Sequence, residues 1–388
     1  MTNNLSKMQK KVLFYCQHSM GIGHLVRSFA LANSLKKYFK VILISGGEFP
    51  EGIKVPKDIN FIQLPPIGYD ANNLLIPIGT DIPLYEVMKI RKKNILDIFI
   101  NSEPDFFITE HFPFGKILFM GELLPILKYI KVNNIDVKVI CSSRDILEPK
   151  TVKKEMLENF SIKILNHYYS KILVHGDENF ISFDQTFPKF KNIKIPISYT
   201  GYISNKKYVS KINRDNFKEI VLSAGGGKVA SLFINKMISS FNKYGFGKNI
   251  ILRVIVGPIF PNNDWLKLQD LVKSNTNIIL IRSVESLSET WKKAKLSISP
   301  GGYNTTIETL CSRIPALIVP YCNDSNSEQK IRTTRLKKEG LVEMLHLENT
   351  SELQIAHAVN KALCFNPIDK KINLNGADNT VLILQKLS

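Results

Sequence analysis

The 388-residue sequence is poor in cysteine, and its cysteines form no pattern. The five residues, at positions 16, 141, 311, 322 and 364, are scattered without a Cys-x-x-Cys pair. This spacing argues against a disulfide framework or a zinc site, so we expect reduced structural thiols in a cytoplasmic protein. The sequence also lacks an Asp-x-Asp cluster or any other group of metal ligands. We therefore expect neither a metal ion nor a resident cofactor.

Long hydrophobic runs are missing as well. No stretch of about 18 apolar residues occurs, so the sequence predicts no transmembrane helix. The segment from Met1 to Lys10 is polar and has no apolar centre, which is unlike a secretory signal. Hydrophobic residues make up 44% of the chain and charged residues 22%, values typical of a soluble globular protein. The length is sufficient for two domains of ordinary size.

Acidic residues are fewer than basic residues. The chain has 52 lysines and arginines against 34 acidic residues, giving a net charge of +18. This balance favours anionic partners such as nucleic acid, anionic lipid headgroups or anionic substrates. The lysines are spread along the chain, and there is no arginine-rich arm, zinc-finger spacing or aromatic-basic RNA motif. Nucleic acid is therefore the less favoured partner, and an anionic membrane surface or an anionic acceptor is preferred.

Apolar, β-prone runs alternate with helical periodicity in both halves of the chain. Residues 11–16 and 41–45 read as buried strands around an amphipathic helix near 25–37, the opening of a doubly wound α/β domain. The same strand–helix order begins again at 219–222. A polar, lysine-rich stretch before it has the composition of a linker. We expect a domain at 1–203, a linker at 204–217, a second domain at 218–372 and a final helical segment at 373–388.

A glycine turn between Leu296 and Glu308 is the most informative stretch. A short apolar run ends at Ser299-Pro300-Gly301-Gly302, and Asn304, Thr305 and Thr306 then offer N-cap side chains to a helix whose apolar period begins at Ile307. Adjacent glycines let a ligand approach the backbone, and a helix N-terminus suits a phosphate. Glu308 is placed to accept hydrogen bonds from a ribose diol. By itself the turn also fits an α/β domain without a ligand.

Two further glycine loops follow predicted strands. Gly21-x-Gly23-His24 lies between the first strand and the first helix, where open α/β sheets bind ligands. His24 is a candidate base, or a residue that only caps the helix. The second loop, Ser223-Ala224-Gly225-Gly226-Gly227-Lys228, lacks the Walker spacing, so we do not interpret it as a P-loop.

Polar side chains also end two other strands of the first domain. Glu110 and His111 follow the strand at 105–109, on the same predicted rim as His24, where a carboxylate could orient an imidazole base. Glu110 could equally cap the following helix. Arg144 follows the strand at 137–141 and could hold a phosphate or an anionic acceptor, or could form a structural ion pair with Asp145.

The combined motifs resemble the GT-B glycosyltransferases, and most closely the family containing the lipid-linked N-acetylglucosaminyltransferase of peptidoglycan synthesis. The likeness lies in the glycine turn, one glutamate on the following helix, a strand ending in proline, and a loop ending in an acidic residue and glutamine. The matching positions here are Gly301, Gly302, Glu308, Pro315, Pro320, Glu328 and Gln329. The sugar-nucleotide hydrolases of pseudaminic acid synthesis show a similar opening loop, matched by Gly21, Gly23, His24 and Arg27. Met20 stands where the peptidoglycan enzyme usually has glycine, so the acceptor loop is expected to differ.

The resemblance implies two Rossmann-like domains that face a cleft, with a last helix that crosses back to the first domain. It places the nucleotide base near Val284 and the donor pyrophosphate near the two rear glycine loops. Separately, the segment from Ile67 to Pro83 is irregular and long for a connection, so we interpret it as an acceptor-site loop. The basic helix after Gln329 is expected to present Arg332 and Arg335 as a solvated face. The expected donor-binding residues are Ser223, Gly225, Gly226, Val284, Gly301, Gly302, Asn304, Thr305, Glu308, Glu328 and Gln329, and the acceptor or phosphate residues are Gly21, Gly23 and Arg144.

The expected reaction is transfer of a sugar from a nucleotide sugar, with UDP favoured, to an acceptor hydroxyl with inversion and without a metal. His24 is the first candidate for the base and Glu110 the second. A lipid-linked or anionic acceptor would place the enzyme at the inner face of the membrane. One alternative is a nucleotide-sugar hydrolase or epimerase on the same fold, in which His24 activates water. Another is a non-catalytic nucleotide-sugar-binding or RNA-binding protein.

Overall fold

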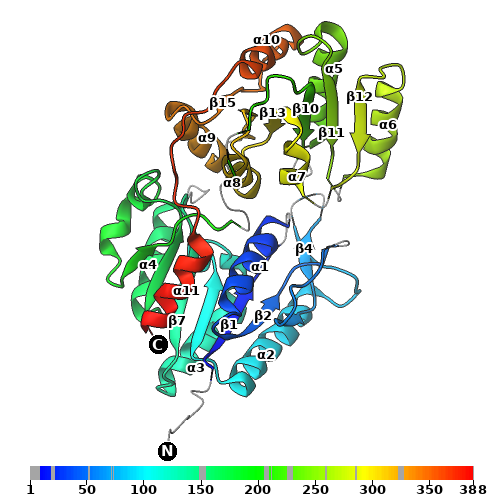
Figure 1. The fold of residues 1–388 in the computed structure, drawn as a ribbon. Coiled ribbons are helices and arrows are strands. Elements are labelled where there is room, and N and C mark those ends of the chain that lie inside the picture. Colours follow the sequence, from blue (N-terminus) through cyan, green and yellow to red (C-terminus); the bar gives the residue numbers. More distant parts are fainter. Residues whose placement is uncertain are drawn as a thin grey trace, which may run out of the picture. The chain divides into compact units, whose positions relative to one another are not determined.

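The structure is a computed structural model that describes residues 9–18, 22–50, 53–70, 72, 74–147, 154–204, 209–210, 212–224, 230–257, 260–284, 286–321 and 327–387. The chain forms two compact units. The first contains Met1–Ile203 together with Asn375–Ser388, and the second contains Ser204–Leu374. Each is a parallel α/β unit, as the alternation of strands and helices predicts, and each is described by itself below (Figure 1).

A parallel sheet of seven strands forms the centre of the first unit, in the order β3-β2-β1-β6-β7-β8-β9. The order reverses between β1 and β6, which pair in register from Val12 with Phe106 to Tyr15 with Thr109. Ligands of open α/β sheets bind at the carboxyl ends of the strands beside such a reversal. The strands are β1 (Lys11–Cys16), β2 (Lys40–Ser45), β3 (Asn60–Gln63), β6 (Phe106–Glu110), β7 (Lys138–Arg144), β8 (Lys171–His175) and β9 (Ile197–Tyr199).

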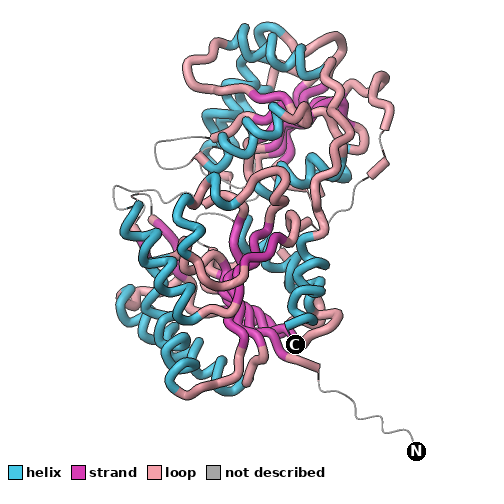
Figure 2. Tube along the Cα trace, turned by 90° about the vertical axis from the view of Figure 1, so that its left-hand side faces the viewer, coloured by secondary structure: helices cyan, strands magenta, loops and turns pink. Residues whose placement is uncertain are grey.

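Helices cover both faces of this sheet, because successive side chains of a strand point to opposite faces (Figure 2). Leu13 and Tyr15 of β1 pack into the core under α2, α3 and α4. Val12 and Phe14 pack into the core under α1 and α11. The helices are α1 (Gly23–Leu35), α2 (Leu84–Ser102), α3 (Met120–Val132, after the 3-10 turn Ile117–Phe119), α4 (Lys154–Tyr168) and α11 (Gly376–Leu387).

The final helix, α11, belongs to the first unit and lies beside α1 (Figure 1). Its Val381 and Leu384 are buried in the same core as Phe29 of α1. The entry to this helix is tightly packed, since a Cβ atom on Gly376 would lie 2.3 Å from the carbonyl oxygen of Gly201. Helix α11, which is distant in sequence from the rest of the first unit, is thus held there by its packing contacts.

Two parts of the first unit differ from the sequence-based expectation. The segment from Ile67 to Pro83 is not irregular throughout, because β4 (Ile67–Tyr69) and β5 (Leu75–Pro77) pair as an antiparallel hairpin. Apolar contacts hold this hairpin on the first turns of α2, with Leu75 packed against Val87 and Leu84 nearby. Strand β3 was not expected, since its residues are largely exposed at the sheet edge and show little apolar alternation.

The second unit contains a parallel sheet of six strands in the order β12-β11-β10-β13-β14-β15. Its order reverses between β10 and β13, so this unit repeats the plan of the first. The strands are β10 (Glu219–Ser223), β11 (Ile251–Ile255), β12 (Ile278–Ile281), β13 (Ala294–Ser299), β14 (Ala316–Ile318) and β15 (Glu343–Met344). The helices are α5 (Ala230–Tyr244), α6 (Asn262–Val272), α7 (Leu287–Trp291), α8 (Tyr303–Ser312), α9 (Glu328–Lys338) and α10 (Glu352–Leu363).

The core of the second unit lies mainly between the sheet and the pair α5 and α10, as Ile234, Met237 and Ile355 are fully buried there. The segment before β10 is more than a solvated linker. Arg214 is buried, and its guanidinium donates to the carbonyl oxygen of Trp291 at 2.6 Å and also to that of Ala294. Trp291 ends α7 and Ala294 begins β13, so Arg214 satisfies an acceptor that the helix itself leaves open and ties the helix to the strand that follows it.

Candidate active site

The carboxyl ends of β1 and β6 bring His24 and Glu110 together. His24 lies in the first turn of α1, and Glu110 is the last residue of β6. Their Nδ1 and Oε1 atoms are 2.7 Å apart. The Glu110 side chain is 1% exposed, whereas His24 keeps 18% of its side chain exposed. The partly open imidazole is therefore anchored by a buried carboxylate.

The partners of His24 determine its tautomer. Its Nε2 lies 2.6 Å from Nη2 of Arg144, the last residue of β7. A guanidinium only donates hydrogen bonds, so Nε2 accepts and carries no proton. The proton is therefore on Nδ1, which donates to Glu110. Burial and then the Arg144 charge hold the pKa of His24 well below its usual range, so the ring is neutral near pH 7.

Glu110 is ionised. Burial opposes its charge, but His24, Arg27 and His111 outweigh that effect and hold the pKa of this carboxyl well below its usual range. Arg27 is the decisive neighbour, because it is permanently charged and donates to the same oxygen that accepts from His24. A carboxylate held in this way is a poor proton acceptor. Its geometry suits an orienting group for His24 better than the catalytic base that was its alternative role.

Two structural alternatives for these residues are wrong. The N-cap of α1 is Ile22, without a capping side chain, so His24 is not a cap. The 3-10 turn that leads into α3 begins after Lys116, also without a capping side chain, so Glu110 does not cap it. His18 is buried and donates from Nε2 to the carbonyl oxygen of Glu48 at 2.8 Å, which is a structural role.

The loop after β6 carries His111, which the sequence placed on the same rim as His24, and Lys116, which the sequence did not single out. His111 and Lys116 have φ angles of 63° and 61°, the left-handed region that favours glycine. Gly115 packs on the His111 ring, where a Cβ atom would lie 2.5 Å from its Cδ2. The rings of His111 and His24 are 6.3 Å apart. Burial lowers the pKa of His111 to about 3, so this imidazole is also neutral.

In the second unit, the glycine turn leads from β13 directly into α8. The N-cap is Gly302, and no side chain caps the helix. Asn304, Thr305 and Thr306 therefore lie within the first turns and do not act as the caps that the sequence suggested. The helix begins at Tyr303, earlier than the apolar period indicates, because the turn itself supplies extended backbone at Gly302, with φ −61° and ψ 144°. An uncapped helix N-terminus of this length suits an anionic ligand.

The two glycines of this turn have different surroundings. A Cβ atom on Gly301 would lie 2.7 Å from Oγ1 of Thr333 and 3.3 Å from the backbone oxygen of Gln329, so this residue packs against α9. A Cβ atom on Gly302 would meet nothing within 4 Å. Its dihedral angles suit any residue. Neither packing against the described residues nor backbone strain requires glycine at 302, so this position has room for close approach of a ligand.

Buried hydroxyl groups surround the turn. Ser223 ends β10, Ser299 ends β13, Thr306 lies on α8 and Thr333 on α9. All four side chains are buried, and their oxygen atoms have no hydrogen-bond partner within the described part of the chain. Buried polar atoms nearly always have a hydrogen-bond partner, so we expect a water molecule or a ligand atom at each of these hydroxyl groups. This arrangement fits the expectation that Ser223 and Thr305 line a phosphate site, although Thr305 itself is only half-buried.

The residues expected to bind ribose and sugar lie on α8 and α9. Glu308 is half-buried on α8. Gln329, near the start of α9, accepts from the backbone N–H of Tyr321 at 3.0 Å. Glu328 is paired with Arg332, at 2.8 Å between Oε1 and Nη2. Val284 packs with Trp291 in a small apolar cluster that also contains Val221 and Ile255 of the sheet.

The expectation of a solvated arginine face on α9 is wrong for Arg332. This side chain is 1% exposed, and its guanidinium lies 5.2 Å from the centre of the Tyr303 ring. Tyr303 is the residue that follows the glycine turn, so Arg332 joins α9 to the first turn of α8. Arg335 is 34% exposed and pairs with Glu339 at 2.9 Å, closer to the expected solvated face.

Several predicted site residues lie outside the described residues, namely Met20, Gly21, Gly225, Gly226 and Lys228, together with Cys322. Gly23 is described and exposed at the start of α1. The four described cysteines are free thiols. Within the described ranges, no helix has the length and apolar character to cross a membrane, and no group of three or more acidic, histidine or cysteine residues could hold a metal ion.

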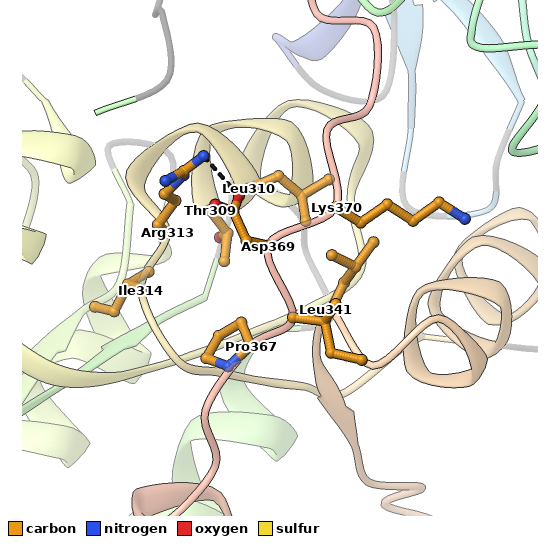
Figure 3. Close-up of a pocket in the computed structure, with 9 residues that line it drawn as sticks. Thr309, Leu310, Arg313, Ile314, Leu341, Pro367, Asp369 and Lys370 are labelled. Atoms are coloured by element: carbon orange, nitrogen blue, oxygen red, sulfur yellow. Dashed lines mark hydrogen bonds and ion pairs between the residues drawn. The ribbon is translucent and has the colours of Figure 1, made fainter. Parts of the chain in front are cut away.

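A hollow at the opposite end of α8 is too small for a nucleotide. It encloses about 40 Å³ between Arg313, Leu341 and the segment from Pro367 to Lys370 (Figure 3). Arg313 and Asp369 form an ion pair of 2.7 Å across it. Ligand pockets are typically several hundred Å³, so this hollow is not a substitute for the site at the N-terminus of α8.

Comparisons with known proteins bear on the fold and on the family resemblance. Residues 220–375 match the glycosyltransferase family 28 C-terminal domain. The chain is 22% identical over 354 residues to the UDP-N-acetylglucosamine--N-acetylmuramyl-(pentapeptide) pyrophosphoryl-undecaprenol N-acetylglucosamine transferase of Oenococcus oeni, covering 88% of this chain and 86% of the relative.

Solved structures share the fold over nearly the whole chain. Acinetobacter baumannii MurG has a TM-score of 0.57 at 14% identity, covering 97% of this chain and 99% of the other. A UDP-glucosyltransferase from Polygonum tinctorium has a TM-score of 0.62 at 11% identity, covering 97% and 98%. The resemblance seen in the sequence motifs is thus confirmed. The chain is a nucleotide-sugar-dependent glycosyltransferase of the GT-B fold that resembles the MurG-like enzymes and carries a family 28 C-terminal domain.

Proposed function

We propose that the protein transfers a sugar from a UDP-sugar to a hydroxyl group of an anionic, lipid-linked acceptor, with inversion at the anomeric carbon and without a metal ion. The observation that carries this proposal is the neutral His24, oriented by Glu110 at 2.7 Å. An imidazole fixed in one tautomer by a buried carboxylate is the arrangement that general-base catalysis requires. Direct attack by a hydroxyl activated in this way inverts the anomeric centre.

The donor half of the proposal rests on the second unit. The uncapped N-terminus of α8 and the open side of Gly302 offer backbone N–H groups to the diphosphate. These groups would stabilise the charge that develops on the leaving diphosphate, the role that a metal ion fills elsewhere. Glu308 is proposed to hold the ribose, and Glu328 with Gln329 the sugar hydroxyls. The uridine nucleotide is inferred from the names of the Oenococcus and Polygonum proteins.

The acceptor half rests on charge and on exposed apolar residues. The name of the Oenococcus relative describes a pyrophosphoryl-undecaprenol acceptor, which is anionic and lipid-linked. The hairpin and the start of α2 expose Leu74, Ile82 and Tyr85, by 62%, 45% and 62%. The exposed ammonium of Lys89 lies 5.1 Å from the Tyr85 ring. Apolar side chains beside lysines suit the surface of an anionic membrane, so we propose peripheral attachment there.

The first test is titration calorimetry with UDP, dTDP, GDP and their common sugar conjugates. We expect one uridine series to bind, and the matching sugar to be transferred to a lipid extract. Proton NMR of the product gives the anomeric configuration relative to the donor, and activity that survives EDTA supports metal independence. If no nucleotide binds, the donor-site proposal fails. If the donor is only hydrolysed, with every extract tried, the hydrolase alternative replaces it.

A further inference from the structure

The lone pair of the proposed base is covered. Nε2 of His24 accepts a hydrogen bond from Nη2 of Arg144 at 2.6 Å. The other ring nitrogen carries the proton that Glu110 accepts, so it cannot take a second one. Nε2 is therefore the only atom of this ring that can remove a proton from a substrate. In the structure without substrate, that atom is already occupied.

The guanidinium that covers Nε2 lies among other cationic side chains. Arg27, Lys116 and Arg144 lie near one buried carboxylate, Glu110, whose Oε1 already accepts from His24 and Arg27. The Lys116 ammonium is half-buried and makes no hydrogen bond or ion pair with any described residue. A half-buried ammonium of this kind favours a nearby anion, so an anionic group of a substrate would be attracted to these side chains.

We propose that Arg144 is a positioning residue that covers Nε2 of His24 until an anionic group of the acceptor draws the guanidinium away. This inference rests on the proposed function and adds a coupling between acceptor binding and base catalysis. Arg144 and the acceptor anion form a charge-assisted pair, and His24 is left with its lone pair facing the acceptor hydroxyl. The loss of a neighbouring positive charge also makes the imidazole a stronger base.

The coupling protects the donor from water. In transfer, the acceptor oxygen forms a bond to the anomeric carbon, its proton moves to Nε2, and the nucleoside diphosphate leaves with the electron pair of the broken C–O bond. Water could take the place of the acceptor in the same step and waste the donor. With Arg144 on Nε2, a water molecule finds no base. Hydrolysis is thus suppressed until the acceptor has bound.

The first experiment measures release of nucleoside diphosphate from the donor without acceptor, for the wild type, Arg144→Ala, Arg144→Lys and Lys116→Met. General-base catalysis is worth at least about 100-fold, so we expect Arg144→Ala to raise hydrolysis by about tenfold or more. Its KM for the acceptor should rise as well. Arg144→Lys keeps a donor near Nε2 and should restrain hydrolysis. Lys116→Met removes a neighbouring positive charge without uncovering Nε2. It therefore distinguishes the effect of uncovering Nε2 from the effect of losing a nearby charge.

The expected gain in hydrolysis should depend on His24, and a double variant tests this. The double variant His24→Ala/Arg144→Ala should lose the gain in hydrolysis, because the gain requires the imidazole. An unchanged or lower hydrolysis rate in a folded Arg144→Ala variant, as judged by its melting temperature, overturns the proposal. A gain that persists in the double variant overturns it too.

A second measurement decides the matter if Arg144→Ala does not fold. Nitrogen-15 NMR of the wild-type imidazoles is followed against pH, with and without inorganic pyrophosphate as the anion. We expect pyrophosphate to raise the pH at which His24 takes up a proton. The groups that act on this ring are Glu110, Arg144, Lys116 and His111, with Arg27 on the same carboxylate. No change with pyrophosphate overturns the proposal. The NMR result does not depend on turnover, so it stands apart from failure of the proposed glycosyl transfer.

Discussion

The two sheets of this protein share one plan and use it differently. Each is parallel and reverses its strand order once, and each carries polar residues at the carboxyl ends of the strands beside the reversal. In the first unit those residues are titratable and touch one another, as His24, Glu110 and Arg144 do. In the second unit they are glycines, hydroxyl groups and the N-terminus of α8. The same topology thus carries titratable side chains in one unit and hydroxyl groups with a helix N-terminus in the other, which fits the proposed roles in proton transfer and phosphate binding.

The difference lies in how the polar side chains are arranged. At the first rim, side chains of α1, β6 and β7 hydrogen-bond to one another, which fixes the orientation of an imidazole before any substrate binds. Among the described residues, atoms without a partner occur at both rims, as Oε2 of Glu110 and Nδ1 of His111 do at the first and the hydroxyl groups of Ser299 and Thr333 do at the second. A cluster whose members orient one another suits chemistry, and hydroxyl groups around a helix N-terminus suit binding. Substitutions should therefore affect turnover in the first unit and donor affinity in the second.

The largest effect is expected for His24→Ala. Loss of the base should reduce turnover by about 100- to 10,000-fold, while the dissociation constant for the donor nucleotide changes little. Steady-state kinetics and calorimetry on the same preparation measure both quantities. A loss of donor affinity as large as the loss of turnover would show that His24 is not the base. It would also contradict the assignment of turnover to the first unit and donor binding to the second.

The reciprocal effect is expected for Glu308→Ala. A charged hydrogen bond to ribose is worth about 1.5–3 kcal/mol, so donor affinity should fall by about 10- to 100-fold. The effect should be confined to nucleotides with an intact diol. Calorimetry with UDP and with 2′-deoxy-UDP tests this, since the variant should bind both equally weakly. A variant that still prefers UDP would show that another residue reads the ribose.

The plan of the fold could be predicted because it depends on local patterns. Alternation of apolar runs and helical periods located most strands within a few residues, including β1, β8 and β10, and the glycine turns marked both rims. The elements that were missed are those that lack such a pattern. Strand β3 is exposed at the sheet edge, and the β4–β5 hairpin is held by contacts with α2 rather than by its own sequence.

The sequence could predict which residues belong to the site, but not the contacts between them. His24, Glu110 and Arg144 each stand at the end of a strand, and parallel strands bring such ends together. Their contacts could not be foreseen, because the lengths and directions of three side chains decide whether Arg144 reaches Nε2 or Asp145. The prediction that Arg332 is solvated was wrong for a similar reason. A basic helix looks solvated in sequence, but the ring of Tyr303 lies over one of its guanidinium groups.

The adjacent glycines of the α8 turn should separate stability from binding. Gly301→Ala places a Cβ atom 2.7 Å from Thr333 Oγ1, an overlap that typically costs about 1–3 kcal/mol. Gly302→Ala meets nothing within 4 Å and should change the free energy of unfolding by less than about 1 kcal/mol. Its added methyl group should instead lower donor affinity. Urea unfolding and UDP titration of the pair test this, and equal behaviour of the two variants would refute it.

The smallest effect is a difference in acid sensitivity. The described histidines of the first unit include the half-buried His111 and the fully buried His175, and burial lowers the pKa of each to about 3. In the unfolded chain a histidine binds a proton below about pH 6.5, so the unfolded state gains protons first as the pH falls. Stability conferred by the neutral rings is complete above about pH 6.5 and declines towards pH 3, by up to about 1.4 kcal/mol per pH unit for each histidine.

The second unit should lack this decline, because both its histidines, His346 and His357, are exposed. Hydrogen exchange between pH 7 and pH 4 should therefore show the sheet of the first unit losing protection earlier than the sheet of the second. His175→Gln removes one titrating ring that is held by Ser142 and Thr200, at 2.7 and 2.8 Å. This variant should be less stable at pH 7 but should lose stability less steeply on acidification, whereas His357→Gln should leave the slope unchanged. Equal slopes in the wild type and both variants would place the acid sensitivity elsewhere, in paired carboxylates such as Glu110.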